Sequence, residues 1–169
     1  MHVKLFDIQN GVVIPSEHCY ILKSLKDIID NYPEEYMKIF MYLFYMHCMN
    51  PEINTMMHLH EDEKEAIIMK EISGTFNTDD ALIMIANTSV AKMYATPTSR
   101  AYKGIKGMLD RLASFMETTA LSDDNINSLV NAAAKYEAIR QSYKGTYKDL
   151  LEEQKSKTKG DQNLGYDQQ

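Results

Sequence analysis

Apolar residues recur every three or four positions along most of the chain, which is the spacing of one face of an α-helix. The longest such run consists of Ile126, Leu129, Ala133, Tyr136, Ile139, Tyr143, Tyr147 and Leu150. It predicts a helix from 123 to 154, about 45 Å long at a rise of 1.5 Å per residue. Such a helix outruns the core of a 169-residue domain. We therefore expect part of its apolar face to pack against something outside the subunit.

The start of the chain has a different pattern. Residues 3–14 alternate loosely between apolar and polar side chains and are interrupted by Asn10-Gly11. Asn-Gly between two apolar runs is the strongest short signal for a β-hairpin. We predict a small hairpin or an extended arm over 1–14, suited to adding a strand to another chain.

Between these two segments, caps and helix breakers predict five further helices. Ser16 is the predicted N-cap of the first of these helices. Either Asn77 or Thr78 is the predicted N-cap of a later helix. The predicted helices cover 17–31, 33–49, 61–72, 78–94 and 97–119. The predicted fold class is mainly α, a bundle of about six helices that forms one domain over 15–154.

The last segment, 155–169, is polar, contains glycine and has no helical periodicity. We expect an extended tail here, because so polar a segment has little apolar surface to bury. It ends in two isolated apolar residues, Leu164 and Tyr166, which we predict to anchor the tail on a partner. The alternative is a tail that is solvated throughout.

The net charge of −6 argues against a free-standing nucleic-acid-binding protein. Two windows depart from this average. The window Lys92–Arg111 holds five basic residues against one acid, and the window Glu61–Glu71 holds five acids against two lysines. Opposite charges on one molecule suit head-to-tail association of identical subunits. The alternatives are that the two windows pair within the subunit or that both are solvated.

No pattern in the sequence gathers the residues of an active site, so we expect neither an enzyme nor a cofactor. His58 and His60 are the best metal candidates, but a zinc site needs three or four convergent ligands, and we expect no metal. Cys19 and Cys48 lie in apolar helical patterns and are predicted to be buried free thiols in a reducing compartment. The most apolar run, 39–46, is too short to span a membrane.

Two Tyr-Lys-Gly triplets, at 102–104 and 143–145, first suggest phosphate binding. Their spacing fits neither a Walker loop nor a dinucleotide-binding loop, and no predicted strand precedes them. Their glycines fall inside helical patterns, where glycine costs about 1 kcal/mol relative to alanine. We expect a close backbone approach or a bend at such positions. The predicted partner contacts are Gly104, Gly107, Lys103, Lys106, Arg111, Tyr143, Gly145, Tyr147, Leu164 and Tyr166.

Four segments, in order over nearly the whole chain, are similar to one known family. They are NGVVIPSEHCYILKSLKDIIDNYPEEYMKIFMYLFYM, EDEKEAII, ATPTSRAYKGIKGMLDRLASFM and AIRQSYKGTYKDLLEEQ. The set resembles the small virion structural proteins of large tailed, crAss-like bacteriophages. The resemblance implies a neck or tail component, built as a ring of copies around the DNA channel. The connection between Thr119 and Ser122 is shorter here than in that family.

The expected architecture also looks like the head-to-tail adaptors of short-tailed phages, which dock beneath the portal as a dodecamer. The expected function is thus a head-to-tail connector ring protein of about twelve copies, located in the virion neck or tail and assembled in the cytoplasm of the bacterial host. Its expected neighbours are the portal protein, other neck or tail ring proteins and the genomic DNA in the channel. One alternative is another tail-ring, capsid-vertex or packaged virion protein. The other is a small helical nucleic-acid-binding regulator that uses Lys92–Arg111.

Overall fold

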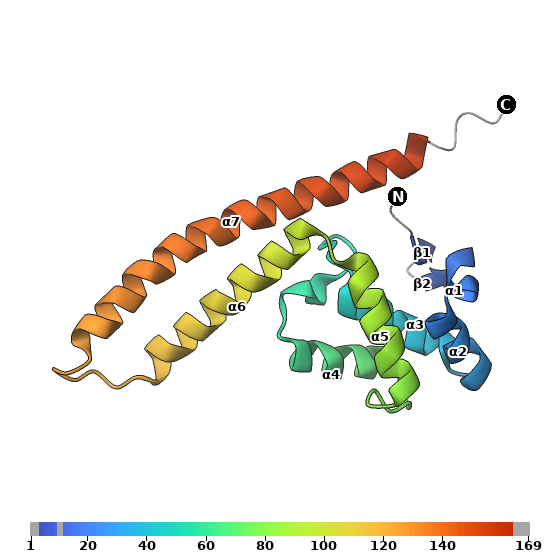
Figure 1. The fold of residues 1–169 in the computed structure, drawn as a ribbon, viewed down its shortest axis with the longest axis horizontal. Coiled ribbons are helices and arrows are strands. Elements are labelled where there is room, and N and C mark those ends of the chain that lie inside the picture. Colours follow the sequence, from blue (N-terminus) through green and yellow to red (C-terminus); the bar gives the residue numbers. More distant parts are fainter. Residues whose placement is uncertain (1–3, 10–11, 164–169) are drawn as a thin grey trace. The chain divides into compact units, whose positions relative to one another are not determined.

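The computed structural model describes residues 4–9 and 12–163, and the side chains of these residues as far as Ser156. Within that part of the chain there are seven α-helices, one 3-10 helix and a two-stranded antiparallel hairpin, which confirms the predicted fold class (Figure 1). The chain divides into two compact units, Met1–Ala95 and Thr96–Gln169. The boundary falls within the range 15–154 for which the sequence pattern suggested one domain.

The N-terminal hairpin forms as predicted. Strands β1 (Phe6–Gln9) and β2 (Val12–Pro15) pair antiparallel, with Phe6 opposite Pro15. The turn predicted at Asn10-Gly11 lies outside the described residues. Phe6 is buried, so the hairpin contributes to the core of the first unit.

Ser16 occupies the N-cap position of α1 (Glu17–Ile21), but its side chain makes no capping hydrogen bond. Its hydroxyl instead donates to the backbone carbonyl of Lys4, at 2.7 Å. Because Ser16 follows β2 directly, its hydroxyl lies nearer to the neighbouring strand than to the helix. The predicted helix 17–31 is also interrupted: Leu22 has an extended backbone (φ −70°, ψ 116°) and separates α1 from α2 (Lys23–Asn31).

Helix α3 (Tyr36–His47) is the centre of the first unit. It contributes six buried residues to the core, Ile39, Phe40, Tyr42, Leu43, Phe44 and Met46. The ring of Phe6 packs against those of Phe40 and Phe44, with centroids 5.6 and 6.1 Å apart. Tilted and edge-on rings at such separations are favourable contacts. The helix is thus buried on most faces, as its apolar sequence indicates.

A buried asparagine holds the end of α3. Asn54 is fully buried, and its side-chain nitrogen donates to the carbonyls of Tyr45 at 2.6 Å and Cys48 at 2.8 Å. Its side-chain oxygen accepts from the Met56 backbone nitrogen at 3.1 Å, at the start of the 3-10 helix η1 (Thr55–His58). Helix C-termini leave carbonyls without partners in the helix, and Asn54 satisfies two carbonyls at this one.

Two more helices complete the first unit, α4 (Glu61–Glu71) and α5 (Ala81–Tyr94). The predicted caps of α5, Asn77 and Thr78, are wrong. The N-cap is Asp80, whose carboxylate accepts from the backbone nitrogen of the second helical residue at 2.9 Å. Asn77 forms a turn before the helix, with its side-chain oxygen on the backbone nitrogen two residues later at 3.1 Å. The helix therefore begins later than predicted.

The second unit is a helical hairpin of α6 (Pro97–Thr118) and α7 (Ile126–Asn163), which lie side by side and antiparallel (Figure 1). Thr96 and Ser99 form a capping box at the start of α6, with side-chain to backbone bonds of 3.1 and 2.9 Å. The Thr96 hydroxyl also donates to the Glu153 carboxylate on α7, at 3.1 Å. This contact fixes the register of the two helices.

Helix α7 is longer than predicted. The expected boundaries were 123 and 154, and the helix begins at Ile126 and continues to Asn163. The first part of the segment expected to be an extended tail is therefore helical. Residues 164–169 lie outside the described part of the chain.

Candidate functional site

Most of the predicted partner contacts lie on the α6–α7 hairpin. Gly104, Gly107, Lys103, Lys106 and Arg111 belong to α6, and Tyr143, Gly145 and Tyr147 belong to α7. The other two, Leu164 and Tyr166, lie outside the described residues.

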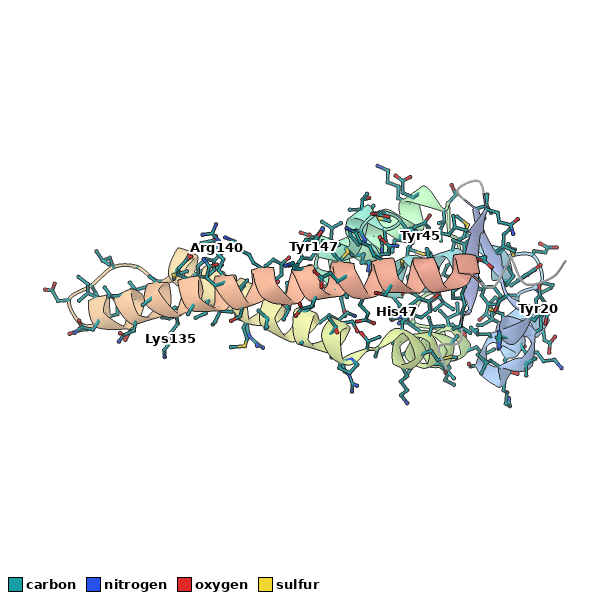
Figure 2. The ribbon with its side chains drawn as sticks, turned by 90° about the horizontal axis from the view of Figure 1, so that it is seen from above. Tyr20, Tyr45, His47, Lys135, Arg140 and Tyr147 are labelled. Atoms are coloured by element: carbon teal, nitrogen blue, oxygen red, sulfur yellow. The ribbon has the colours of Figure 1, made fainter. Side chains whose placement is uncertain are left out.

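Tyr143 and Tyr147 lie one turn apart on α7, and both pack against Tyr102 of α6. Their ring centroids are 5.3 and 6.0 Å from that of Tyr102, and the two α7 rings stack at 6.3 Å with an interplanar angle of 6°. Figure 2 labels Tyr147 on its helix. These rings join the two helices of the hairpin, so both α7 tyrosines have a role inside the unit. Both are only half-buried, and their contact with a partner stays a prediction.

Tyr102 is a residue that sequence reasoning missed. It is almost fully buried, with 1% of its surface exposed, and its hydroxyl lies 3.0 Å from that of Tyr143. Burial raises the pKa of Tyr102, and the hydrogen bond with Tyr143 adds to the effect. The repeated triplet could have indicated this contact, because Tyr102 and Tyr143 are the first residues of its two copies.

The three glycines do not have the role expected of them within the chain. Among the described residues, a Cβ built at Gly104, Gly107 or Gly145 meets no heavy atom within 4 Å apart from the nearby backbone of its own helix and its chain neighbours. None of the three interrupts its helix. The expected close backbone approach is therefore absent from the described part of the chain, and a close approach by another chain stays a prediction.

The basic window is split between the two units. Lys92 lies on α5, and the other four basic residues lie on α6. Lys106 pairs with Asp110 one turn later on α6, at 2.7 Å. Arg100 and Arg111 are exposed. The window therefore does not belong to one helix or to one unit.

Two charged residues of the acidic window, Lys64 and Glu65, make hydrogen bonds within the first unit. Lys64 is 5% exposed, and its amine donates to the Met46 carbonyl at 2.7 Å. Glu65 accepts hydrogen bonds from the hydroxyls of Tyr42 at 3.1 Å and Thr78 at 2.8 Å. Burial, together with the charge of Glu65, raises the pKa of Tyr42. The exposed charges left on α4 are mainly acidic.

The end of the α6–α7 hairpin exposes large apolar side chains. We call Phe115, Leu121, Ile126 and Val130 the hairpin tip; their exposed fractions are 40, 74, 43 and 62%. The connecting turn is held by Asn125, whose side chain accepts from the Ser122 backbone nitrogen at 2.9 Å and donates to the Ala120 carbonyl at 2.6 Å. The feature of the sequence that could have indicated this surface is Leu121, an apolar residue inside a short polar connection.

The described residues show no metal-binding constellation. No group of three or more His, Cys, Asp or Glu side chains among them is placed to hold an ion. The best candidates in the sequence, His58 and His60, do not gather further ligands: His60 lies 3.7 Å from Asp62, and both side chains are exposed. Where the structure describes a helix, none is both long and apolar enough to cross a membrane.

Comparisons with family models, with curated proteins and with solved structures found no match to this chain.

Proposed function

We propose that this chain is a non-enzymatic structural subunit of a tailed-phage virion, most specifically a head-to-tail connector ring protein that docks on the portal around the DNA channel. The proposal starts from the resemblance of its four sequence segments to small virion proteins of crAss-like phages. The structural observation that supports it is the form of the α6–α7 hairpin.

One helix of that hairpin extends beyond the other. The contact between Thr96 and Glu153 places the first turn of α6 beside residue 153 of α7, yet α7 runs on to Asn163. The last ten residues, about 15 Å at 1.5 Å per residue, thus extend past the start of α6. At the other end of the hairpin the apolar tip is exposed. This apolar tip suits a contact with another chain.

The test is the mass of the assembled species, alone and with the portal protein. Native mass spectrometry and electron microscopy of the purified chain should show rings of about twelve copies, either free or formed on an isolated portal ring. A chain that stays monomeric at all concentrations, with and without portal, would contradict the proposal. Rings that form but do not bind the portal would point to the alternative positions in the tail or capsid.

The regulator alternative makes a separate prediction. A nucleic-acid-binding protein that uses Lys92–Arg111 should bind duplex DNA with an affinity that falls steeply with salt. Lys106 of this window already pairs with Asp110, at 2.7 Å, which favours the regulator less than the structural role. Lack of DNA binding at low salt would remove it.

A further inference from the structure

The α6–α7 hairpin brings together two basic segments that are far apart in the sequence. Segment 100–111 of α6 has four bases against Asp110, and segment 135–148 of α7 has four bases against Glu137. The packing of Tyr102 against Tyr143 and Tyr147 places these segments side by side. Together they hold eight bases against two acids, a net charge of +6 in a chain whose net charge is −6.

Six basic side chains of the hairpin share one side of it. Consecutive residues of a helix are rotated by about 100°, and two antiparallel helices are related by a two-fold axis perpendicular to the plane that contains them. The lysines that directly follow the three contacting tyrosines therefore turn to the same side of the hairpin. The other three bases follow at helical spacings of three, four or seven residues. We call this set the basic hairpin face: Lys103, Lys106, Arg140, Lys144, Lys148 and Lys155.

The basic hairpin face is accessible. All of its side chains are exposed except Lys106, which is partly buried. Lys135 does not belong to this face, because it lies on the opposite side of α7 from Arg140 (Figure 2).

The acids near this face do not cancel its charge. Three acids pair with its bases, at 2.7, 3.2 and 3.9 Å: Asp110 with Lys106, Glu137 with Arg140 and Glu152 with Lys148. The next two acids, Asp149 and Glu153, are rotated from Lys148 by about 100° and 140° and point elsewhere. Six bases against three acids leave a net charge of +3 on the face.

The first unit carries a surface of opposite charge. Segment 61–80 contains seven acids against two lysines. The Thr78 hydroxyl donates to Glu65 at 2.8 Å, which places the start of α5 beside the first turns of α4. Burial raises the pKa of Tyr42, and the negative charges of Glu65, Asp79 and Glu61 raise it further, so these carboxylates gather around one hydroxyl. We call this set the acidic surface: Glu61, Asp62, Glu63, Glu65, Asp79 and Asp80.

The lysines near the acidic surface leave its sign unchanged. Lys64 is 5% exposed and turns inward, where its amine donates to the Met46 carbonyl. Lys70 lies seven residues after Glu63, about 10 Å further along α4. Lys38 reaches the Ser73 carbonyl, beyond the same far end of α4.

Both surfaces have exposed apolar side chains beside their charges. Ile67 follows Glu63 by one helical turn and is 38% exposed, and Met84 follows Asp80 by one turn and is 53% exposed. On α7 the face of Arg140 continues towards Val130 and Ile126, which are 62 and 43% exposed. Protein interfaces combine apolar contacts with a polar rim. The charges would therefore orient a contact that the apolar side chains stabilise.

We propose that the basic hairpin face of one copy binds the acidic surface of the next copy. Because the two surfaces differ, the contact is heterologous, and its repetition generates a ring when the rotation closes. Duplex DNA fits the basic hairpin face less well, since a uniform polyanion cannot complement the carboxylates of Asp110 and Glu137, whereas the acidic surface has Lys70 at its edge. This inference rests on the proposed ring function and names the contact that builds the ring.

The direct test is an exchange of charges between full-length variants. The first variant is Lys103→Glu with Lys144→Glu, and the second is Asp62→Lys with Glu63→Lys. Each alone should assemble at least about tenfold more weakly than the unmodified chain, because like charges then meet. An equal mixture should assemble again, since the two reversed surfaces match each other and so do the two native ones. Mass photometry across a dilution series, with and without portal rings, measures assembly.

Two controls separate charge from folding. Lys23→Glu with Lys26→Glu reverses two exposed lysines of α2 that belong to neither surface, and it should assemble as the unmodified chain does. Asp62→Asn with Glu63→Gln places no positive charge at the start of α4, and it should weaken assembly in the same direction as the reversal. Circular dichroism verifies that each variant is folded.

The unmodified chain gives a readout that needs no substitution. Raising the salt concentration from about 0.05 to about 0.5 M screens charges, so it should weaken assembly. Rings whose formation does not change with salt would contradict a charged contact.

The two levels of the hypothesis fail differently. If the unmodified chain forms rings and both reversal variants assemble as it does, the docking contact is wrong and the ring function stands. If both folded variants lose assembly and their mixture does not regain it, the two surfaces do not meet between copies; duplex-DNA binding that only the first variant loses would then assign the basic hairpin face to DNA. If the unmodified chain never assembles, with or without portal, both proposals fall.

Discussion

The hydroxyl of Tyr102 lies 3.0 Å from the hydroxyl of Tyr143, and these are the first residues of the two Tyr-Lys-Gly triplets. Residues two apart on a helix are rotated by about 200°, so tyrosine and glycine of one triplet lie on opposite sides. Each triplet therefore turns its tyrosine to the seam between α6 and α7. Its glycine faces open space. Within the chain, the triplets thus contribute to helix packing through their tyrosines.

Tyr102, Tyr143 and Tyr147 form the contact between α6 and α7, which we call the tyrosine seam. Substitutions in this seam should lower stability in proportion to what they remove. Tyr102→Ala should lower the free energy of unfolding by about 3–5 kcal/mol, because it removes a large buried ring. Tyr102→Phe keeps the ring and removes one hydrogen bond, and should cost about 1 kcal/mol. Urea unfolding followed by circular dichroism measures both. The control is Tyr20→Phe, at a half-exposed tyrosine of the first unit, which should leave the free energy of unfolding unchanged. If both Tyr102 variants also have effects this small, the seam does not stabilise the hairpin.

The buried amide of Asn54 predicts a large effect in the first unit. Asn54→Ala leaves the carbonyls of Tyr45 and Cys48 without their donor and removes the acceptor at the start of η1. Buried polar groups without partners are costly, and the loss should be at least about 2 kcal/mol. The matched control is Asn77→Ala, because Asn77 is exposed and its side chain makes one hydrogen bond to the backbone. Equal losses at the two positions would contradict this role for Asn54.

The sequence predicted the elements well and their ends less well. Periodic apolar residues, caps and helix breakers together indicated the helices, and Asn10-Gly11 indicated the hairpin. The break at Leu22 had no signal, since an apolar residue there continues the helical pattern while its backbone is extended. The early end predicted for α7 followed from the loss of apolar periodicity after residue 154, yet no proline follows, and the helix continues to Asn163.

The candidate site was predicted in part. The triplets directed attention to the correct helices, and Tyr143 and Tyr147 were among the predicted contacts, but Tyr102, which both of them contact, was not. Leu121 escaped notice because one apolar residue in a polar connection has no periodicity; its display depends on the Asn125 bonds, which only a structure shows. The sequence counted Lys64 only as one of two lysines in the acidic window, and its contact with the Met46 carbonyl had no sequence signal.

The buried thiol of Cys19 predicts a loss of stability at alkaline pH. Burial raises the pKa of Cys19 from 9.0 to about 11, so the folded chain holds a proton that the unfolded chain releases earlier. The resulting stabilisation is complete below about pH 9 and disappears as pH rises through about 11. In urea unfolding between these values, Cys19→Ala should lose less stability per pH unit than the unmodified chain. Parallel curves for the two would show that Cys19 does not contribute.

The end of α7 predicts a separation of folding from assembly. Deleting 155–169 should leave a folded, helical subunit, because the Thr96–Glu153 contact and the tyrosine seam precede the cut. The truncated chain should no longer assemble on its partner. Deleting 164–169 alone should have the same effect if Leu164 and Tyr166 are the anchors. Circular dichroism reports folding and mass photometry reports assembly; normal assembly of both truncations would contradict a role for this end of the chain.

Replacing Gly145 with alanine should have opposite effects on the stability of the subunit and on the assembly of the ring. In the described chain, a Cβ at this position meets nothing within 4 Å beyond its chain neighbours and the nearby backbone of its own helix. Gly145→Ala should therefore stabilise the subunit by about 0.5–1 kcal/mol through the helix propensity of alanine. If another backbone approaches closely there in the assembly, the same methyl group should weaken ring formation. The control is Ala138→Gly, at an exposed position of the same helix. It should destabilise the subunit. Under conditions in which the variant is folded, it should form rings as the unmodified chain does. A Gly145→Ala variant that is more stable and forms rings as before would leave this glycine without a packing role, and the close approach would have to be sought at Gly104 or Gly107.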